Sequence, residues 1–187
     1  MNGTRAMITV WDPSLVNITG DFSLSEIWVT AGGGSGPILN TIETGWQVYP
    51  GRTGDAKPKT FYILDGRRDK CVVVVCRWNS GGILAGKLFV ALRDGADTII
   101  WGGEIFDSSG SGGFHTLTQM GSGHLAGEGY GKASHVRHFM YYDSSGQTVS
   151  LTQNDLVGYA PAPDCYNYEY DNSSSELYFF YGGPGCT

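Results

Sequence analysis

The chain has 187 residues, a length that fits one domain with a sizeable core, and we expect a single domain over residues 1–187. Its 29 glycines, 13% aromatic and 16% charged residues suit a turn-rich β protein rather than a helical one. The net charge of -6 argues against a nucleic-acid partner, because phosphate binding needs clustered lysine and arginine. No apolar run approaches the roughly 20 residues that span a bilayer, so we expect no membrane partner.

Short apolar or alternating runs, separated by Gly, Asp, Asn and Pro, predict about a dozen strands. In chain order they are Met7–Trp11, Glu26–Thr30, Thr41–Tyr49, Thr60–Leu64, Cys71–Trp78, Lys87–Arg93, Thr98–Phe106, His115–Met120, Ala133–Tyr142, Thr148–Thr152, Cys165–Tyr170 and Leu177–Tyr181. No long stretch has helical periodicity. This pattern predicts an all-β fold, either a sandwich or a barrel.

The four cysteines are Cys71, Cys76, Cys165 and Cys186. An even number of cysteines suggests disulfides and an exported protein, and the spacing allows one pair in each half of the chain. Buried free thiols are the alternative. A zinc site is disfavoured, because the sequence has no C-x-x-C.

Several familiar catalytic signatures are missing. No serine has glycine both two residues before and two after it, and HExxH, P-loop and complete G-x-G-x-x-G motifs are absent. His135 and His138 would point to opposite faces of a strand, which argues against a shared metal. We therefore expect no metal and no cofactor, and the carboxylates remain as acid–base candidates.

Glu43 is an acid inside a strongly apolar predicted strand. Because side chains alternate between the two faces of a strand, Glu43 shares its face with Gly45. Gln47 and Tyr49 lie on that face too, where they are suited to orient a carbonyl group or a water molecule. Trp46 points the other way.

Glu104 repeats this arrangement in a second apolar strand, with Gly102 on its own face. A glycine beside each acid removes a side chain and leaves a groove in which a peptide backbone could lie. Two nearby carboxyl groups can hydrolyse a peptide bond without a metal: the ionised one takes a proton from water, and the protonated one donates to the leaving amine. The alternative is that both are solvent-facing or structural acids.

Six segments resemble the neprosin family, in the order that the family has them. They are Ser25–Thr30, Asn40–Gly51, Trp101–Ile105, His115–His124, Glu128–Ser134 and Tyr181–Cys186. The resemblance implies an antiparallel β-sandwich of two packed, curved sheets, lectin-like or jelly-roll-like, with little or no helix. It also implies a secreted, acid-active, pepstatin-insensitive endopeptidase that acts on peptides or proteins; the type member of the family cleaves after proline.

The family's two catalytic glutamates lie in N-x-I-E-x-G-W and W-G-G-E motifs, which correspond to Glu43 and Glu104 here. The resemblance implies the disulfides Cys71–Cys76 and Cys165–Cys186. Gln119 is implied as a cleft residue. Structural packing is the alternative role for Gln119, Trp46 and Trp101. Of these, Gln119 and Trp46 are expected supporting residues of the site. Nothing in the sequence demands more than a monomer.

The segment between Cys76 and Trp101 is shorter than in plant members and lacks their G-D-W-W and G-Y-W-P region. A preference for proline is therefore a narrower expectation than peptidase activity. The alternative function is a non-catalytic, lectin-like module that binds glycan or peptide through its aromatic side chains.

Overall fold

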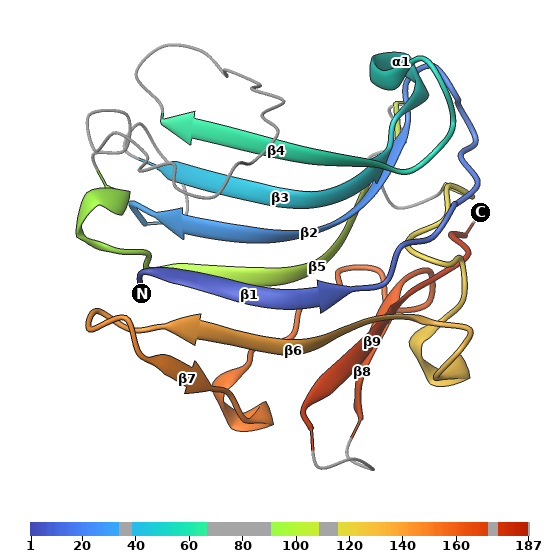
Figure 1. Ribbon diagram of the computed structural model, residues 1–187. Helices are drawn as coiled ribbons and strands as arrows, with labels where there is room; N and C mark the ends of the chain where they lie inside the picture. Colours follow the sequence, from blue (N-terminus) through green and yellow to red (C-terminus); the bar gives the residue numbers. More distant parts are fainter. Residues whose placement is uncertain (34–38, 67–90, 109–115, 172–175, 187) are drawn as a thin grey trace.

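The computed structural model describes residues 1–33, 39–66, 91–108, 116–171 and 176–186. Two antiparallel sheets pack against each other (Figure 1). Sheet 1 has the order β1-β6-β9-β8, with β7 paired to β6, and its strands are β1 (Gly3–Ile8), β6 (Ser134–Tyr142), β7 (Thr148–Ser150), β8 (Asn167–Asp171) and β9 (Tyr178–Gly182). Sheet 2 has the order β4-β3-β2-β5, and its strands are β2 (Phe22–Ala31), β3 (Asn40–Val48), β4 (Lys59–Gly66) and β5 (Thr98–Phe106).

Helix is confined to single turns in the described part of the chain: α1 (Pro50–Thr53), η1 (Leu92–Asp94), η2 (Ala126–Glu128) and η3 (Gln153–Asp155). The turn α1 begins at a proline, whose fixed φ suits the first helical position. It ends at Gly54, which has a φ of 82° that favours glycine. The fold is therefore an all-β sandwich, as expected.

Most predicted strands are present, and β5 has the predicted bounds. The first strand begins and ends earlier than predicted: it covers Gly3–Ile8, whereas Met7–Trp11 was expected. Residues 116–119 form no strand, and Met120 makes only an isolated bridge to Gly183. The predicted strand Cys71–Trp78 and most of Lys87–Arg93 lie outside the described residues.

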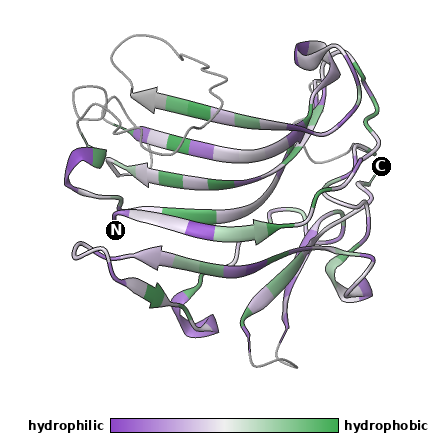
Figure 2. Ribbon diagram, in the orientation of Figure 1, coloured by the Kyte–Doolittle hydropathy of each residue, from purple (hydrophilic) through white to green (hydrophobic). Residues whose placement is uncertain are grey.

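The core lies between the two sheets. Val136, Phe139, Phe179 and Tyr181 form its buried cluster on sheet 1. Trp101 of β5 packs on Phe139, with ring centroids 5.3 Å apart. Figure 2 shows that hydrophilic bands interrupt the hydrophobic strands, as expected where only one face of a strand is buried in a core. Since Trp101 faces sheet 1, the even-numbered residues of β5 face away from it.

Asp21 fixes the start of β2 against the end of β5. Its buried carboxylate accepts hydrogen bonds from Ser108 N at 2.9 Å and Ser108 Oγ at 2.7 Å. It also accepts from Thr118 Oγ1 at 2.7 Å and from Asn17 N at 3.1 Å. Burial acts to raise the pKa of Asp21, but these hydrogen bonds outweigh it and lower the pKa below its ordinary value.

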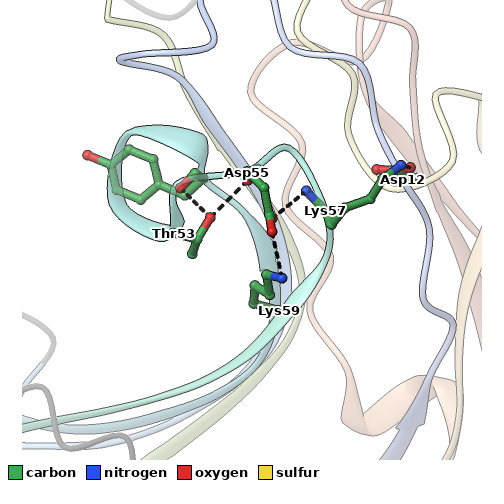
Figure 3. A network of polar contacts seen from close by, with 6 residues as sticks. Asp12, Thr53, Asp55, Lys57 and Lys59 are labelled. Atoms are coloured by element: carbon green, nitrogen blue, oxygen red, sulfur yellow. Dashed lines mark hydrogen bonds and ion pairs between the residues drawn. The ribbon is translucent and has the colours of Figure 1, made fainter.

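A polar network at the α1 turn joins β3 and β4 to the segment after β1 (Figure 3). Lys57 Nζ lies 2.7 Å from Asp12 Oδ2, and Lys59 Nζ lies 2.9 Å from Asp55 Oδ2. Thr53 Oγ1 donates to the Asp55 carbonyl at 2.9 Å. Because these ion pairs are exposed, they orient the turn more than they stabilise the fold.

Candidate active site

Glu43 and Glu104 lie on one face of sheet 2, the face turned away from sheet 1. Across the central strand β2, Glu43 is paired in register with Trp28, and Glu104 is paired with Leu24. Leu24 and Trp28 are four residues apart on one strand, so they point to the same side. The register therefore brings both predicted glutamates to a single surface, and both are half-buried there.

A third glutamate lies between them. Glu26 of β2 pairs in register with Gly45 on one side and with Gly102 on the other. It shares the face of Glu43 and Glu104, since it alternates with Leu24 and Trp28 along β2. The predicted site did not include Glu26, although the signal that selected the other two acids, a glutamate in an apolar strand, applies to it equally.

The paired residues form a grid of three rows across β3, β2 and β5. The rows are Gln47–Leu24–Glu104, Gly45–Glu26–Gly102 and Glu43–Trp28–Ile100. From strand spacing and rise, Glu43 and Glu104 are offset by roughly 10 Å across the strands and roughly 13 Å along them, measured between backbones in a flat sheet. Glu26 occupies the midpoint of this diagonal, so a group bridging the outer acids would lie over it.

Glu26 is almost fully buried, with 3% of its surface exposed, and neither carboxyl oxygen has a hydrogen-bond partner among the described residues. Burial, followed by the charges of Glu43 and Glu104, raises the pKa of Glu26 to about 9. Burial and the charge of Glu43 also raise the pKa of Glu104. At acidic and neutral pH, Glu26 is therefore a neutral carboxylic acid that can donate a hydrogen bond.

Glu43 has a different local environment. Its Oε1 accepts a hydrogen bond from Thr41 Oγ1 at 2.8 Å, two residues earlier on the same face of β3. The cluster therefore combines an acid that accepts a hydrogen bond with two whose pKa values are raised, which suits a division into base and acid.

The two glycines beside Glu26 have different structural roles. A Cβ built on Gly45 would overlap the carbonyl oxygen of Ser25 and lie 2.7 Å from Glu26 Cα. A Cβ on Gly102 would meet nothing within 4 Å. Gly45 is thus required by the close approach of β2 and β3, whereas only Gly102 opens space beside an acid.

This difference predicts opposite outcomes for a matched pair of alanine substitutions. Gly45→Ala is expected to lower the free energy of unfolding by at least about 2 kcal/mol, because the backbone of β2 must move. Gly102→Ala, in open space, is expected to change it by no more than about 0.5 kcal/mol. Urea denaturation of both variants measures the difference, and equal losses would contradict the assigned roles.

Aromatic side chains border the glutamate face at both ends. Phe22 stacks on Phe106, with ring centroids 5.4 Å apart, and packs on Tyr49 at 5.3 Å. This group lies next to Glu104, and Trp28 lies beside Glu43. Phe106 is 49% exposed and can contact a ligand.

A cleft of about 850 Å³ runs along β5. Glu104, Gly102 and Trp28 line it from sheet 2, and Leu156 and Tyr159 line it from the segment that follows β7. β5 ends the strand order of sheet 2 in the described part of the chain. Trp101 of β5 and Phe179 of β9 also line it, so the cleft borders both faces of β5 and reaches Glu104 at this edge of sheet 2.

The other expected site residues divide into two groups. Gln47 and Gly102 lie on the glutamate face, and Tyr49 is in the aromatic group at its end. Trp46 is buried on the opposite face, where its Nε1 donates to the Thr9 carbonyl at 2.8 Å. Gln119 Oε1 accepts from Ser14 N at 3.0 Å. Both side chains therefore bond to the segment that follows β1.

The disulfide Cys165–Cys186 is present, with its Cα atoms 5.1 Å apart, and it fits a protein of an oxidising compartment. Cys71 and Cys76 lie outside the described residues. Within the described ranges, no group of three or more His, Cys, Asp or Glu is arranged to hold a metal ion. No described helix is long and apolar enough to cross a membrane.

One known protein family matches most of this chain. The matched region includes sheet 2 with all three glutamates, and it extends over β6, β7, β8 and β9 of sheet 1. The sequence model of the family described as Neprosin matches residues 19–77 and 79–184, and the chain therefore belongs to the Neprosin family.

Proposed function

We propose that this protein is a secreted acid endopeptidase of the glutamic type, in which Glu43 and Glu104 hydrolyse a peptide bond with an activated water molecule. Family membership supports the broader assignment to a peptidase-related function. The observation that carries the finer assignment is the shared face of Glu43 and Glu104, where the charge of one acts on the pKa of the other.

Glu43 is the proposed general base and Glu104 the proposed general acid. Glu43 takes a proton from water as the water oxygen bonds to the carbonyl carbon of the substrate. Glu104, kept protonated by burial and by the charge of Glu43, donates its proton to the amide nitrogen as the C–N bond breaks. Transfer of the proton from Glu43 back to Glu104 through solvent restores the site.

The proposed substrate is an extended peptide with apolar side chains near the cleaved bond. The stacked Phe22 and Phe106, and Trp28 at the other end, offer apolar surfaces to side chains on either side of the acids. A proline ring suits such flat aromatic surfaces. Preference for proline is the narrower part of this proposal, and peptide hydrolysis does not depend on it.

Digestion of a mixed peptide library by the wild-type protein from pH 3 to pH 7 tests the proposal. Cleavage is expected to be fastest at acidic pH and to fall as Glu104 loses its proton, because its conjugate base cannot protonate the leaving amine. Cleavage should survive EDTA, since no metal takes part in the proposed steps. Failure to cleave at any pH, together with binding to a glycan array, would instead favour the lectin-like module.

A further inference from the structure

Glu26 is the group that the proposed mechanism does not use. It lies at the midpoint between Glu43 and Glu104, on the strand that separates theirs. Its carboxyl group is buried, and neither oxygen has a partner among the described residues. A buried polar group without a hydrogen bond costs free energy, so an arrangement of this kind needs a compensating role.

The register identifies the acceptors that Glu26 can reach. Glu43 and Glu104 are each one strand and two residues away from it, a diagonal distance that long side chains can bridge. Of the two residues directly beside it, Gly102 leaves open space, since a Cβ there would meet nothing within 4 Å. Catalytic hydrogen bonds often tighten only when substrate is bound, so the lack of a bond here is compatible with a donor role.

We propose that Glu26 is a positioning residue of the active site: a neutral carboxyl group that donates a hydrogen bond to the ionised member of the Glu43–Glu104 pair. This inference rests on the proposed function. A hydrogen bond donated to a carboxylate favours its ionised form. Glu26 would therefore keep the general base ionised to lower pH and hold it in position for the attacking water.

The surrounding charges agree with a neutral donor. Glu43 on β3 and Glu104 on β5 act on Glu26, and both oppose its ionisation. Tyr181 of β9 packs against Gly103 on the opposite face of sheet 2, and burial, followed by the charge of Glu26, raises the pKa of Tyr181. Lys59 of β4 pairs in register with Gln47 and so lies on the same face. Its ammonium group forms an ion pair with Asp55. The raised pKa of Glu26 therefore keeps its proton in place over the acidic range in which a glutamic peptidase works.

Two substitutions at Glu26 separate a donor role from a structural one. Glu26→Gln keeps the shape and an N–H donor, whereas Glu26→Leu keeps the size without a donor. Both remove the buried acid, so both are expected to fold, and thermal melting of each verifies this. We would measure kcat and KM for one cleaved peptide from pH 2.5 to pH 7 with the wild type and both variants.

The glutamine variant is expected to keep kcat within about threefold of wild type and to keep the acidic limb of its pH profile. The leucine variant is expected to lose about tenfold in kcat with little change in KM, and its acidic limb should move up by about one pH unit, as for one lost hydrogen bond to a charged group. Wild-type kcat and an unmoved acidic limb in Glu26→Leu would overturn the inference. An equal loss of kcat in Glu26→Gln and Glu26→Leu would also contradict the donor role, because only the glutamine keeps a donor.

The outcomes distinguish this inference from the proposed function. If Glu43→Gln and Glu104→Gln are inactive but Glu26→Leu is fully active, the proposed function stands and only the role of Glu26 is disproved. A readout that needs no turnover is the ¹³C NMR titration of the glutamate carboxyl groups. The lower of the Glu43 and Glu104 titration midpoints is expected to rise by about one unit in Glu26→Leu. Unchanged midpoints would contradict the hydrogen bond whether or not the protein cleaves peptides.

Discussion

Glu43→Gln and Glu104→Gln are each expected to lower kcat by about 100-fold to 10,000-fold, the range that a positioned acid or base contributes. Glutamine has the size of glutamate but can neither take a proton from water nor supply one to an amine. The double variant is expected to be no slower than about the slower single one, because residues that act as a unit are not additive. Initial rates of peptide cleavage at pH 4, measured with equal concentrations of folded protein, test this.

Glu169→Gln is the matched control for these two variants. Glu169 is exposed on β8 of sheet 1, so its replacement removes one carboxylate of the same type away from the glutamate face. It is expected to leave kcat unchanged. Wild-type kcat in either Glu43→Gln or Glu104→Gln would remove that residue from the proposed pair, whatever the control shows.

The free energy of unfolding is expected to fall as the pH rises above about 4.5, because of Glu26. The folded protein raises the pKa of this carboxyl from 4.5 to about 9, so the folded state keeps a proton that the unfolded chain releases. The stabilising contribution is complete below the unfolded pKa and is lost progressively as pH rises toward the folded pKa. For an independent group, the loss between pH 4.5 and pH 7 amounts to about 3 kcal/mol.

Urea denaturation of wild type and Glu26→Gln at pH 5 and pH 8 measures this effect. The variant cannot ionise at this position, so its stability is expected to change less between the two pH values and to exceed that of wild type at pH 8. Asp21, whose pKa is lowered in the folded protein, acts in the opposite direction and mainly below pH 4, outside this window. Parallel changes in wild type and variant would contradict a buried, protonated Glu26.

The local pattern of apolar and polar residues was sufficient to predict most of the strands. The apolar run that forms β5 predicted its bounds, and the runs behind β2, β3 and β6 located those strands within a few residues. Alternation also predicted correctly that Glu43 and Trp46 face opposite sides of β3. Met7–Trp11 was wrong in position because β1 is set by its pairing with β6, a contact between residues far apart in the chain.

The resemblance placed Glu43 and Glu104 in family motifs, but neither motif indicates how their strands are paired. Spacing could not show that β2 lies between β3 and β5, because pairing depends on contacts across the whole domain. Spacing also could not show that Gly45 allows β2 and β3 to approach closely, whereas Gly102 leaves open space beside Glu26. Those two roles follow from what each glycine meets across the sheet.

The sequence by itself determined the all-β class, the alternation of faces and the family motifs, since each depends on residues close together in the chain. The tertiary structure decided which acids share a surface. Cross-strand register is a long-range property, and it placed Glu26 between Glu43 and Glu104 beside two glycines. Burial then made that third acid neutral, an effect of surrounding atoms that local sequence does not specify.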